Sequence, residues 1–391
     1  MITKVIYLGY SAFSEKTKSD FYFKELETKG IDVVYWDLSN IFFKGKITHS
    51  SYFSDFKTID DYTKFREELK KINNTNTLFV TTISYYFNTI KLFYLLKKFD
   101  CKTAFFARGM MPSLIYDKSV ILSKVLNLTS YPTYISTVIK FRIALLIKKL
   151  GLVKILDIIY YAGEESLKNF FVGYNYDLKN AKIYKINYFD YDKTKEIKNS
   201  KKIINNKYCL FHDEYLPFHP DFNIKNVGTV DSEQYFKDLN RFFLEIENKL
   251  NIQVVIAAHP KAKKYKSSNP FNHRKLFFSK TAELSKYSEF SIAHASTSVS
   301  YPVIYNKPVL FINSNQINNT MNTFDKWIEC YANELNSLKI NIDNYTFLEL
   351  SKLSINLDSY QKYKLNYLIS TSLENNSAQI FIESLNHIKE N

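Results

Sequence analysis

The sequence predicts an α/β protein built from two βαβ domains, and three observations lead to this prediction. Short apolar stretches of strand length alternate with longer helical stretches along most of the chain. The lysine- and asparagine-rich segment 192–207 interrupts this alternation once, and we interpret it as a linker. The length of 391 residues agrees with two domains of roughly 100–200 residues each. We therefore expect domains over 1–195 and 206–360, and a C-terminal helix over 361–391 that can cross back.

The N-terminal half shows the alternation clearly. Strands are expected at 5–10, 31–38, 77–84 and 102–107. Helices are expected at 21–30, 60–72 and 86–100, and Gly30 is the expected cap of the first. The apolar stretch 131–162 carries scattered lysines and one arginine, so we expect helices packed on the protein. A second interpretation of this stretch is peripheral contact with a membrane surface.

The C-terminal half repeats the pattern after the predicted linker. Strands are expected within 207–217, 252–260, 289–296 and 309–313. Helices are expected at 232–250 and 280–288, with a helical turn within 297–308 and helical pattern over the last 30 or so residues.

Composition limits the classes of function. The formal net charge of +14 fits a solvated lysine-rich surface, an acidic substrate or an anionic membrane face. A nucleic-acid partner is not expected, because the sequence has no zinc finger, RNP-like aromatic motif or basic heptad region. Three dispersed cysteines, an N-terminal apolar run too short for a signal peptide and the lack of a membrane-length apolar stretch predict a cytoplasmic protein. Peripheral attachment to the inner face of the plasma membrane is the second expectation.

The first candidate functional motif is VVIAAHPKAKKY, residues 254–265. An apolar strand ends at His259, and Pro260 biases that histidine away from helical geometry. Ligands of open α/β sheets bind at the carboxyl ends of strands, where an imidazole can donate a hydrogen bond to a phosphate. Lys261 and the lysines after it add positive potential. The alternative is a strand-ending turn with solvated lysines.

The second motif follows the expected strand at 289–296. Ser296, Thr297 and Ser298 form a cluster of small hydroxyl residues at a helix start, which is a typical anion cradle. We include His294, at the end of the same strand, in the predicted donor site. The alternative is a serine-rich helix cap.

The third motif is an acidic pair. Asp213 and Glu214 follow the strand within 207–217, and one of them can act as a general base that deprotonates an acceptor hydroxyl. The alternative is an exposed turn with a structural aspartate. A second His-Pro pair, His219-Pro220, lies in a proline-containing loop and ranks below His259.

The order of the three motifs resembles the signature of bacterial sialyltransferase-like GT-B glycosyltransferases. This group includes Kdo transferases and other enzymes of capsule, O-antigen and lipopolysaccharide biosynthesis. The resemblance implies two Rossmann-like domains that face each other across a cleft, with the donor in the C-terminal domain. It implies that Asp213 is the catalytic base, that His259 contacts the donor phosphate, and that Ser296 and Thr297 bind the nucleotide-sugar phosphate. The implied donor is a CMP-linked ulosonic acid of the sialic acid or Kdo type.

One residue departs from that signature. Tyr215 stands where the motif has glycine, so the base assignment stays open between Asp213 and Glu214. Segment 107–120 also resembles part of polysaccharide-biosynthesis transferases, in which a strand-end glycine and a downstream aspartate face the cleft.

On that basis the predicted acceptor-binding residues lie at two strand ends of the N-terminal half. They are Gly9, Tyr10, Ser11, Arg108 and Gly109. The expected acceptor is a glycan or glycolipid. We expect neither a metal nor another cofactor, because the only DxD pattern considered, at 190–192, falls in the predicted linker.

Three alternatives remain open at this level. A polyol-phosphate transferase, similar to teichoic-acid glycerophosphotransferases, would use a CDP-alcohol and a second catalytic histidine, for which His212 is the candidate. A UDP-sugar transferase of the same fold would place Glu283 or Glu289 near the ribose. A non-catalytic nucleotide- or glycan-binding protein would use the same scaffold. The oligomeric state is left open.

Overall fold

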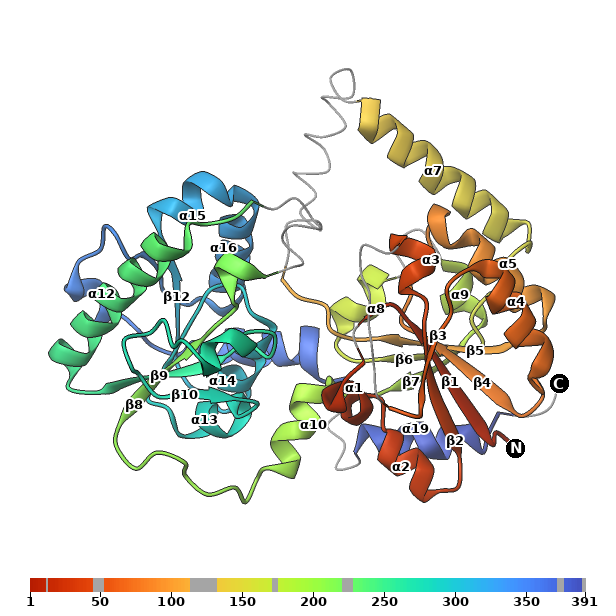
Figure 1. The fold of residues 1–391 in the computed structure, drawn as a ribbon, viewed down its shortest axis with the longest axis horizontal. Helices are drawn as coiled ribbons and strands as arrows, with labels where there is room; N and C mark the ends of the chain where they lie inside the picture. Colours follow the sequence, from red (N-terminus) through yellow and green to blue (C-terminus); the bar gives the residue numbers. More distant parts are fainter. Residues whose placement is uncertain are drawn as a thin grey trace. The chain divides into compact units, whose positions relative to one another are not determined.

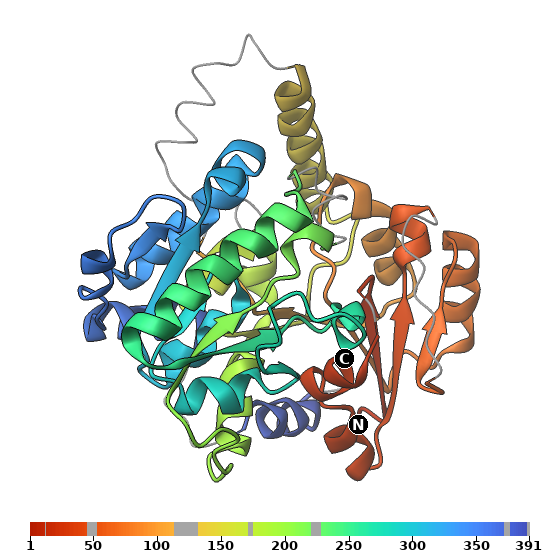
Figure 2. The ribbon, with the colours of Figure 1, turned by 60° about the vertical axis from the view of Figure 1, so that its left-hand side comes forward.

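The structure is a computed structural model, and its described residues form two compact units (Figure 1, Figure 2). The described ranges are 1–11, 13–44, 53–112, 132–170, 175–219, 228–370 and 376–388. Unit 1 draws its residues from Met1–Met110, Lys124–Asn187 and Ile369–Asn391, and unit 2 from Met111–Ser123 and Tyr188–Leu368. Each unit contains one parallel β-sheet covered by helices.

Unit 1 has a seven-stranded sheet in the order β3-β2-β1-β4-β5-β6-β7. The strands are β1 Lys4–Gly9, β2 Asp32–Asp37, β3 Phe56–Thr58, β4 Thr77–Thr81, β5 Lys102–Ala107, β6 Ile158–Tyr161 and β7 Lys182–Lys185. All neighbouring pairs are parallel, as βαβ connections require. The structure confirms the four strands predicted for this half.

Strand β6 corrects the prediction of helices over 131–162. Only the first part of that stretch is helical, as α7, and Ile158–Tyr161 forms a buried strand beside β5. The sequence IIYY consists of β-branched and aromatic residues, which suit a buried strand better than a helix. A short apolar run cannot be assigned to helix or strand by periodicity alone.

The helices of unit 1 surround this sheet. They are α1 Glu15–Asp20, α2 Phe23–Thr28, α3 Ser39–Phe43, α4 Tyr62–Lys71, α5 Ile90–Lys98, α7 Pro132–Lys149, α8 Glu164–Phe170, α9 Asn175–Asn180 and α19 Ser377–Leu385. The C-terminal helix α19 belongs to this unit although the chain of unit 2 precedes it. Phe381 packs edge-on against Phe106 and Tyr160, and Ser384 Oγ lies 2.5 Å from the Tyr160 hydroxyl.

Unit 2 has a six-stranded parallel sheet in the order β10-β9-β8-β11-β12-β13. The strands are β8 Tyr208–His212, β9 Gln253–Ala258, β10 Leu276–Phe278, β11 Ser291–Ala293, β12 Val309–Asn313 and β13 Lys339–Asn341. The helices are α10 Phe189–Glu196, α12 Ser232–Leu250, α13 Thr281–Tyr287, α14 Ser300–Ile304, α15 Asn315–Thr320, α16 Asn322–Leu335, α17 Phe347–Leu350 and α18 Leu357–Tyr363. Helix α12 has the predicted bounds, because the Asp231 carboxylate caps it and its apolar face repeats regularly.

The predicted linker at 192–207 is wrong over its first part. Residues up to Glu196 continue helix α10, which begins at Phe189 in unit 2. The buried Asp190 carboxylate accepts hydrogen bonds from Ser300 Oγ at 2.5 Å and from the Tyr301 hydroxyl at 2.8 Å. The lysines of this segment suggested a solvated linker, but Asp190 and Asp192, which lie among them on the helix, are buried. None of the described helices is both long enough and apolar enough to span a membrane.

Candidate functional site at the carboxyl edge of the unit 2 sheet

Three neighbouring strands of unit 2 end in polar residues at one edge of the sheet. Strand β8 pairs in parallel with β9 on one side and with β11 on the other. The acidic pair follows β8, His259 follows β9, and the serine cluster follows β11. The three predicted motifs therefore come together at the carboxyl edge, where open α/β sheets bind ligands.

Asp213 joins the ends of β8 and β9. Its Oδ2 accepts the backbone N–H of His259 at 3.1 Å, and its Oδ1 accepts the backbone N–H of Tyr215 at 3.0 Å. Burial raises the pKa of Asp213 to about 6, and the two N–H donors partly oppose that rise. Both carboxylate oxygens are thus engaged in fixing the backbone around the site.

Tyr215 occupies the position where the resembled signature has glycine. Its φ of 57° lies in the left-handed region, which glycine adopts readily and other residues rarely. The backbone therefore has the shape that a glycine would give, although a bulky side chain stands there. The Tyr215 ring lies parallel to the His259 imidazole, with centroids 6.4 Å apart.

His259 is half-buried at the end of β9, and a hydrogen bond defines its tautomer. The backbone N–H of Lys261 donates to His259 Nδ1 at 3.2 Å, so the ring proton of the neutral imidazole belongs on Nε2. An Nε2–H group is a suitable donor to a phosphate oxygen. Pro260 and Lys261 are exposed beside it. The His219 ring approaches edge-on, with centroids 4.9 Å apart, and Pro220 lies outside the described residues.

The serine loop, residues 296–298, is tied to the sheet by His212. Ser296 Oγ lies 2.9 Å from Ser298 Oγ, which in turn lies 2.8 Å from His212 Nδ1. His212 Nε2 is 3.0 Å from Ser291 Oγ on β11. Burial lowers the pKa of His212 to about 3, so this histidine is neutral and both its nitrogens are occupied. It holds the loop in place and does not fit the role of a second catalytic histidine.

The accessible hydroxyls of this loop differ in exposure. Thr297 is exposed at the start of the short turn η6 (Thr297–Val299), while Ser296 and Ser298 are half-buried. The Ser296 hydroxyl also accepts the backbone N–H of Ser298 at 3.3 Å. These three hydroxyl residues lie at the same edge of the sheet as His259, separated from it by strand β8. Their role in binding a phosphate stays a prediction.

Glu214 is buried differently from its neighbour Asp213. Neither of its carboxylate oxygens has a hydrogen-bond partner within normal geometry among the described residues. Burial, together with the charge of Asp213, raises the pKa of Glu214 to about 8, and the nearby Ala295 N–H and Ser296 hydroxyl only partly lower it. An unpaired buried carboxylate is energetically costly, and such groups are concentrated at functional sites.

His294 does not belong to this cluster. The structure places its ring in the core, with Nδ1 2.7 Å from the Ile312 carbonyl oxygen and Nε2 3.1 Å from the Tyr235 hydroxyl. Burial lowers the pKa of His294 to about 4. Because its ring is fully engaged in packing, we leave it out of the proposed donor site.

The acceptor-binding residues predicted in unit 1 lie at the carboxyl ends of strands β1 and β5. Gly9 has a structural explanation, since a Cβ atom there would lie 2.2 Å from the Tyr35 hydroxyl oxygen. That hydroxyl donates to the Ser11 carbonyl oxygen at 3.1 Å and accepts the Ser11 N–H at 3.2 Å. Tyr10 is 37% exposed, and Ser11 is exposed. Tyr10 and Ser11 remain predictions for acceptor contact.

Arg108 is a core residue of unit 1. Its guanidinium donates to the Tyr22 hydroxyl at 2.8 Å and to the Asp20 carbonyl oxygen, and it lies 4.5 Å from the centroid of the Phe106 ring. These contacts explain the arginine without an acceptor. Gly109 adopts a φ of 85° just after it. Residues 113–120 of the second resembled segment lie outside the described residues.

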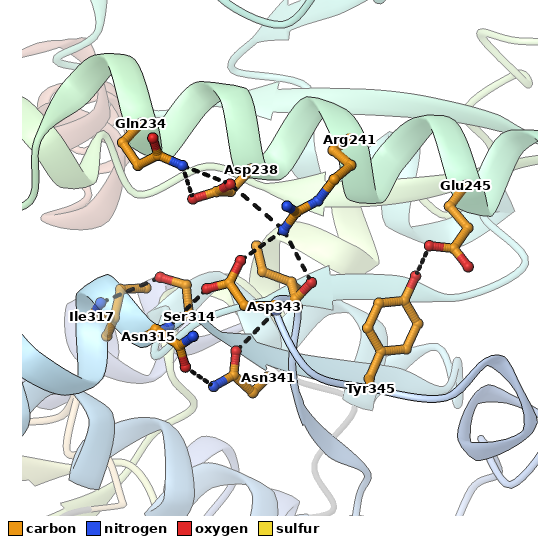
Figure 3. A network of polar contacts seen from close by, with 11 residues as sticks. Gln234, Asp238, Arg241, Glu245, Ser314, Asn315, Ile317, Asn341, Asp343 and Tyr345 are labelled. Atoms are coloured by element: carbon orange, nitrogen blue, oxygen red, sulfur yellow. Dashed lines mark hydrogen bonds and ion pairs between the residues drawn. The ribbon is translucent and has the colours of Figure 1, made fainter.

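Further along the same edge of the unit 2 sheet, the ends of β12 and β13 carry a polar network (Figure 3). Asp343 accepts Arg241 at 2.7 Å and the backbone N–H of Asn315 at 2.9 Å. Asp238 on α12 accepts the Gln234 amide at 2.9 Å. Sequence reasoning missed this network, whose partners come from α12 and from the ends of two strands.

No cluster that could hold a metal ion occurs within the described part of the chain, counting groups of three or more His, Cys, Asp and Glu. Glu283 forms an ion pair with Lys280 at 3.0 Å in the first turn of α13. Glu289 precedes β11 at the amino end of the sheet, opposite the site edge, so it does not fit a ribose-binding role there.

Comparisons with known proteins identify solved structures that have a similar fold. No protein-family model matches the chain, and no curated protein sequence matches it significantly. The wall teichoic acid polymerase TagF aligns with a TM-score of 0.52 at 11% identity, over 98% of this chain and 89% of its own. A putative UDP-N-acetylglucosamine 2-epimerase from Listeria monocytogenes aligns with a TM-score of 0.50 at 10% identity, over 100% of this chain and 97% of its own. With its two parallel sheets, the chain has the α/β GT-B fold that the sequence predicted.

Proposed function

We propose that this GT-B chain is a glycosyltransferase that uses a nucleotide-sugar donor, with the donor phosphate bound at the carboxyl edge of β8, β9 and β11. The observation that carries the proposal is His259, whose imidazole has its proton assigned to Nε2 and lies at the same sheet edge as the serine loop. Neutral donors of this kind stabilise the charge of a departing phosphate. Lys261 adds positive potential at the same place.

The donor that we propose is a CMP-linked ulosonic acid. The ordered motifs that resemble sialyl- and Kdo transferases support it, and so does the glycine-like backbone of Tyr215 at φ 57°. An acidic donor also suits a chain with a formal net charge of +14. The proposed acceptor is a glycan or glycolipid of a surface polysaccharide.

We assign the general base to Glu214. It would take a proton from the acceptor hydroxyl, whose oxygen forms a bond to the anomeric carbon while the bond from that carbon to the phosphate oxygen breaks. The nucleotide leaves with the electron pair, and the His259 Nε2–H group donates to its phosphate. A pKa of about 8 suits a base that works near neutral pH. Because both Glu214 oxygens are buried, the acceptor hydroxyl can reach them only after some local opening of the site.

The test is a thermal-shift panel of CMP, CDP, UDP, GDP and ADP without metal, on wild type and on His259→Ala. We expect stabilisation by CMP and an apparent affinity for CMP at least about tenfold weaker in the variant, because a phosphate contact is lost. A preference for UDP or GDP would contradict the proposed CMP-linked donor but not the fold. If none of the nucleotides raised the melting temperature, the proposed nucleotide-binding site would be wrong.

A second candidate is a polyol-phosphate transferase with a CDP-alcohol donor. The observation that favours it is the His219–His259 pair, with ring centroids 4.9 Å apart, which could provide two histidines for phosphoryl transfer. The His219→Ala variant separates the candidates. Phosphoryl transfer predicts a phosphorus-containing product that this variant loses, whereas glycosyl transfer predicts a phosphorus-free product that the variant still forms.

A further inference from the structure

Helix α7 of unit 1 is apolar on two faces, and only one of them packs on other residues that the structure describes. The packed face contains Ala144, whose carbonyl oxygen accepts the Tyr85 hydroxyl at 2.8 Å. It also contains Lys148, which is fully buried in an ion pair with Asp177. These contacts fix the rotation of the helix about its axis.

The opposite face carries a row of exposed aliphatic side chains, which we call the α7 stripe. Its members on the helix and their exposed fractions are Ile135 44%, Ile139 53%, Ile143 41% and Leu146 54%, and Leu150, 62% exposed in the turn directly after the helix, extends it. At roughly 100° per residue, the four members on the helix lie within an arc of about 80°. Figure 1 shows the helix reaching beyond the sheet of its own unit. A continuous apolar stripe of this kind marks an interaction surface.

Basic residues border the stripe. Arg142 and Lys149 lie along one side and Lys140 along the other, and all three are exposed. The 18 residues of α7 include no acidic residue. An apolar stripe edged by lysine and arginine is typical of helices that lie in the interface of a bilayer, where the basic groups meet anionic headgroups.

We propose that the α7 stripe docks unit 1 on an anionic lipid bilayer, with the helix lying in the plane of the interface. The charge pattern decides between occupants. A second copy of the chain packed stripe against stripe would bring two sets of Arg142, Lys149 and Lys140 together with no acidic partner on the helix, whereas anionic lipid neutralises them. The proposal is independent of the reaction that unit 2 performs.

The experiment is co-sedimentation of the full chain with vesicles of phosphatidylcholine alone or mixed with phosphatidylglycerol. We expect binding to the mixed vesicles that weakens with added salt. The double variant Ile139→Glu/Leu146→Glu should bind about tenfold more weakly or worse, since it removes apolar contact and adds repulsive charge. The triple variant Lys140→Gln/Arg142→Gln/Lys149→Gln should lose the preference for anionic vesicles.

The matched control is Leu244→Glu, which makes the same kind of change at a 55% exposed leucine on α12 of unit 2. It should bind vesicles like wild type, and circular dichroism melting should show that all variants are folded. The proposal would be wrong if the wild type bound neither kind of vesicle, or if the Ile139→Glu/Leu146→Glu variant bound as tightly as the wild type. Self-association without lipid that the stripe variant abolishes would assign the stripe to a second copy instead.

Discussion

Two regions lie along one edge of the unit 2 sheet: the ends of β12 and β13, and the ends of β8, β9 and β11. Their carboxylates differ in whether they have hydrogen-bond partners. In the first region Asp343 pairs with Arg241 and with a backbone N–H, and Asp238 pairs with Gln234 (Figure 3). In the second region Glu214 is buried as well, but neither of its carboxylate oxygens has a hydrogen-bond partner within normal geometry in the described part of the chain. A paired network is explained by the stability it gives, whereas an unpaired buried carboxylate calls for a functional explanation.

The contrast repeats within the second region itself. Asp213 and Glu214 are adjacent in sequence, but Asp213 accepts two backbone N–H groups, and Glu214 accepts none with normal geometry from the residues described. The difference separates a residue that positions His259 from a residue whose acid–base chemistry is available. Four predictions follow from it, in order of expected effect.

Glu214→Gln should lower the rate of nucleotide release from the preferred donor by about a hundredfold or more, the usual contribution of a general base. Its melting temperature should stay the same or rise, because an ionisable group leaves the core. The control Asp343→Asn, at the paired end of the edge, should keep turnover within about twofold. Full activity in Glu214→Gln would remove the base assignment.

The stability of wild type should fall, relative to Glu214→Gln, as the pH rises from about 5 to about 8. Burial raises the pKa of Glu214 from 4.5 to about 8, so folding favours the protonated form and loses that advantage as the group ionises. The expected difference is on the order of 2–4 kcal/mol, measured by urea denaturation across the pH range. Parallel curves for the two proteins would contradict the raised pKa.

Asp213→Asn should destabilise unit 2 by about 1–3 kcal/mol, because one of the two backbone N–H groups loses its acceptor. His259 would lose its fixed position, so nucleotide affinity should drop as well. Denaturation and a nucleotide titration measure the two effects. If Asp213→Asn reduces turnover far more than Glu214→Gln while affinity is kept, the base is Asp213.

Arg241→Ala should cost less than about 1 kcal/mol and leave turnover unchanged, because the arginine side chain is 58% exposed and screened by solvent. Denaturation and a turnover assay under identical conditions would show this. A large loss of activity would mean that the β12 and β13 ends also take part in the reaction.

Much of this edge could be predicted from the sequence, because parallel strands place their carboxyl ends side by side and the three motifs follow three such strands. Which of the two carboxylates has hydrogen-bond partners could not be predicted. Whether Asp213 or Glu214 is free depends on the backbone N–H of His259, which lies 46 residues away. His259 and His294 look alike as strand-end histidines, and only burial separates them.

The fold was predictable where a pattern was long and capped, as in α12, and not where it was short. The four residues of β6 give too few positions to reveal a period. The lysines of helix α10 gave it the composition of a linker. Its burial could not be predicted, because Asp190 is bonded by Ser300 and Tyr301, more than a hundred positions later. Arg108 likewise depends on Tyr22.

Helix α19 has a consequence for how the chain is made in the cell. The ribosome adds this helix after the whole sheet of unit 2, yet Phe381 and Ser384 contact Tyr160, which was added much earlier. The sheet of unit 2 is therefore fully translated while unit 1 still lacks part of its core. Until α19 emerges, Phe106 lacks its contact with Phe381, and during that interval unit 1 exposes apolar surface that chaperones and proteases can bind.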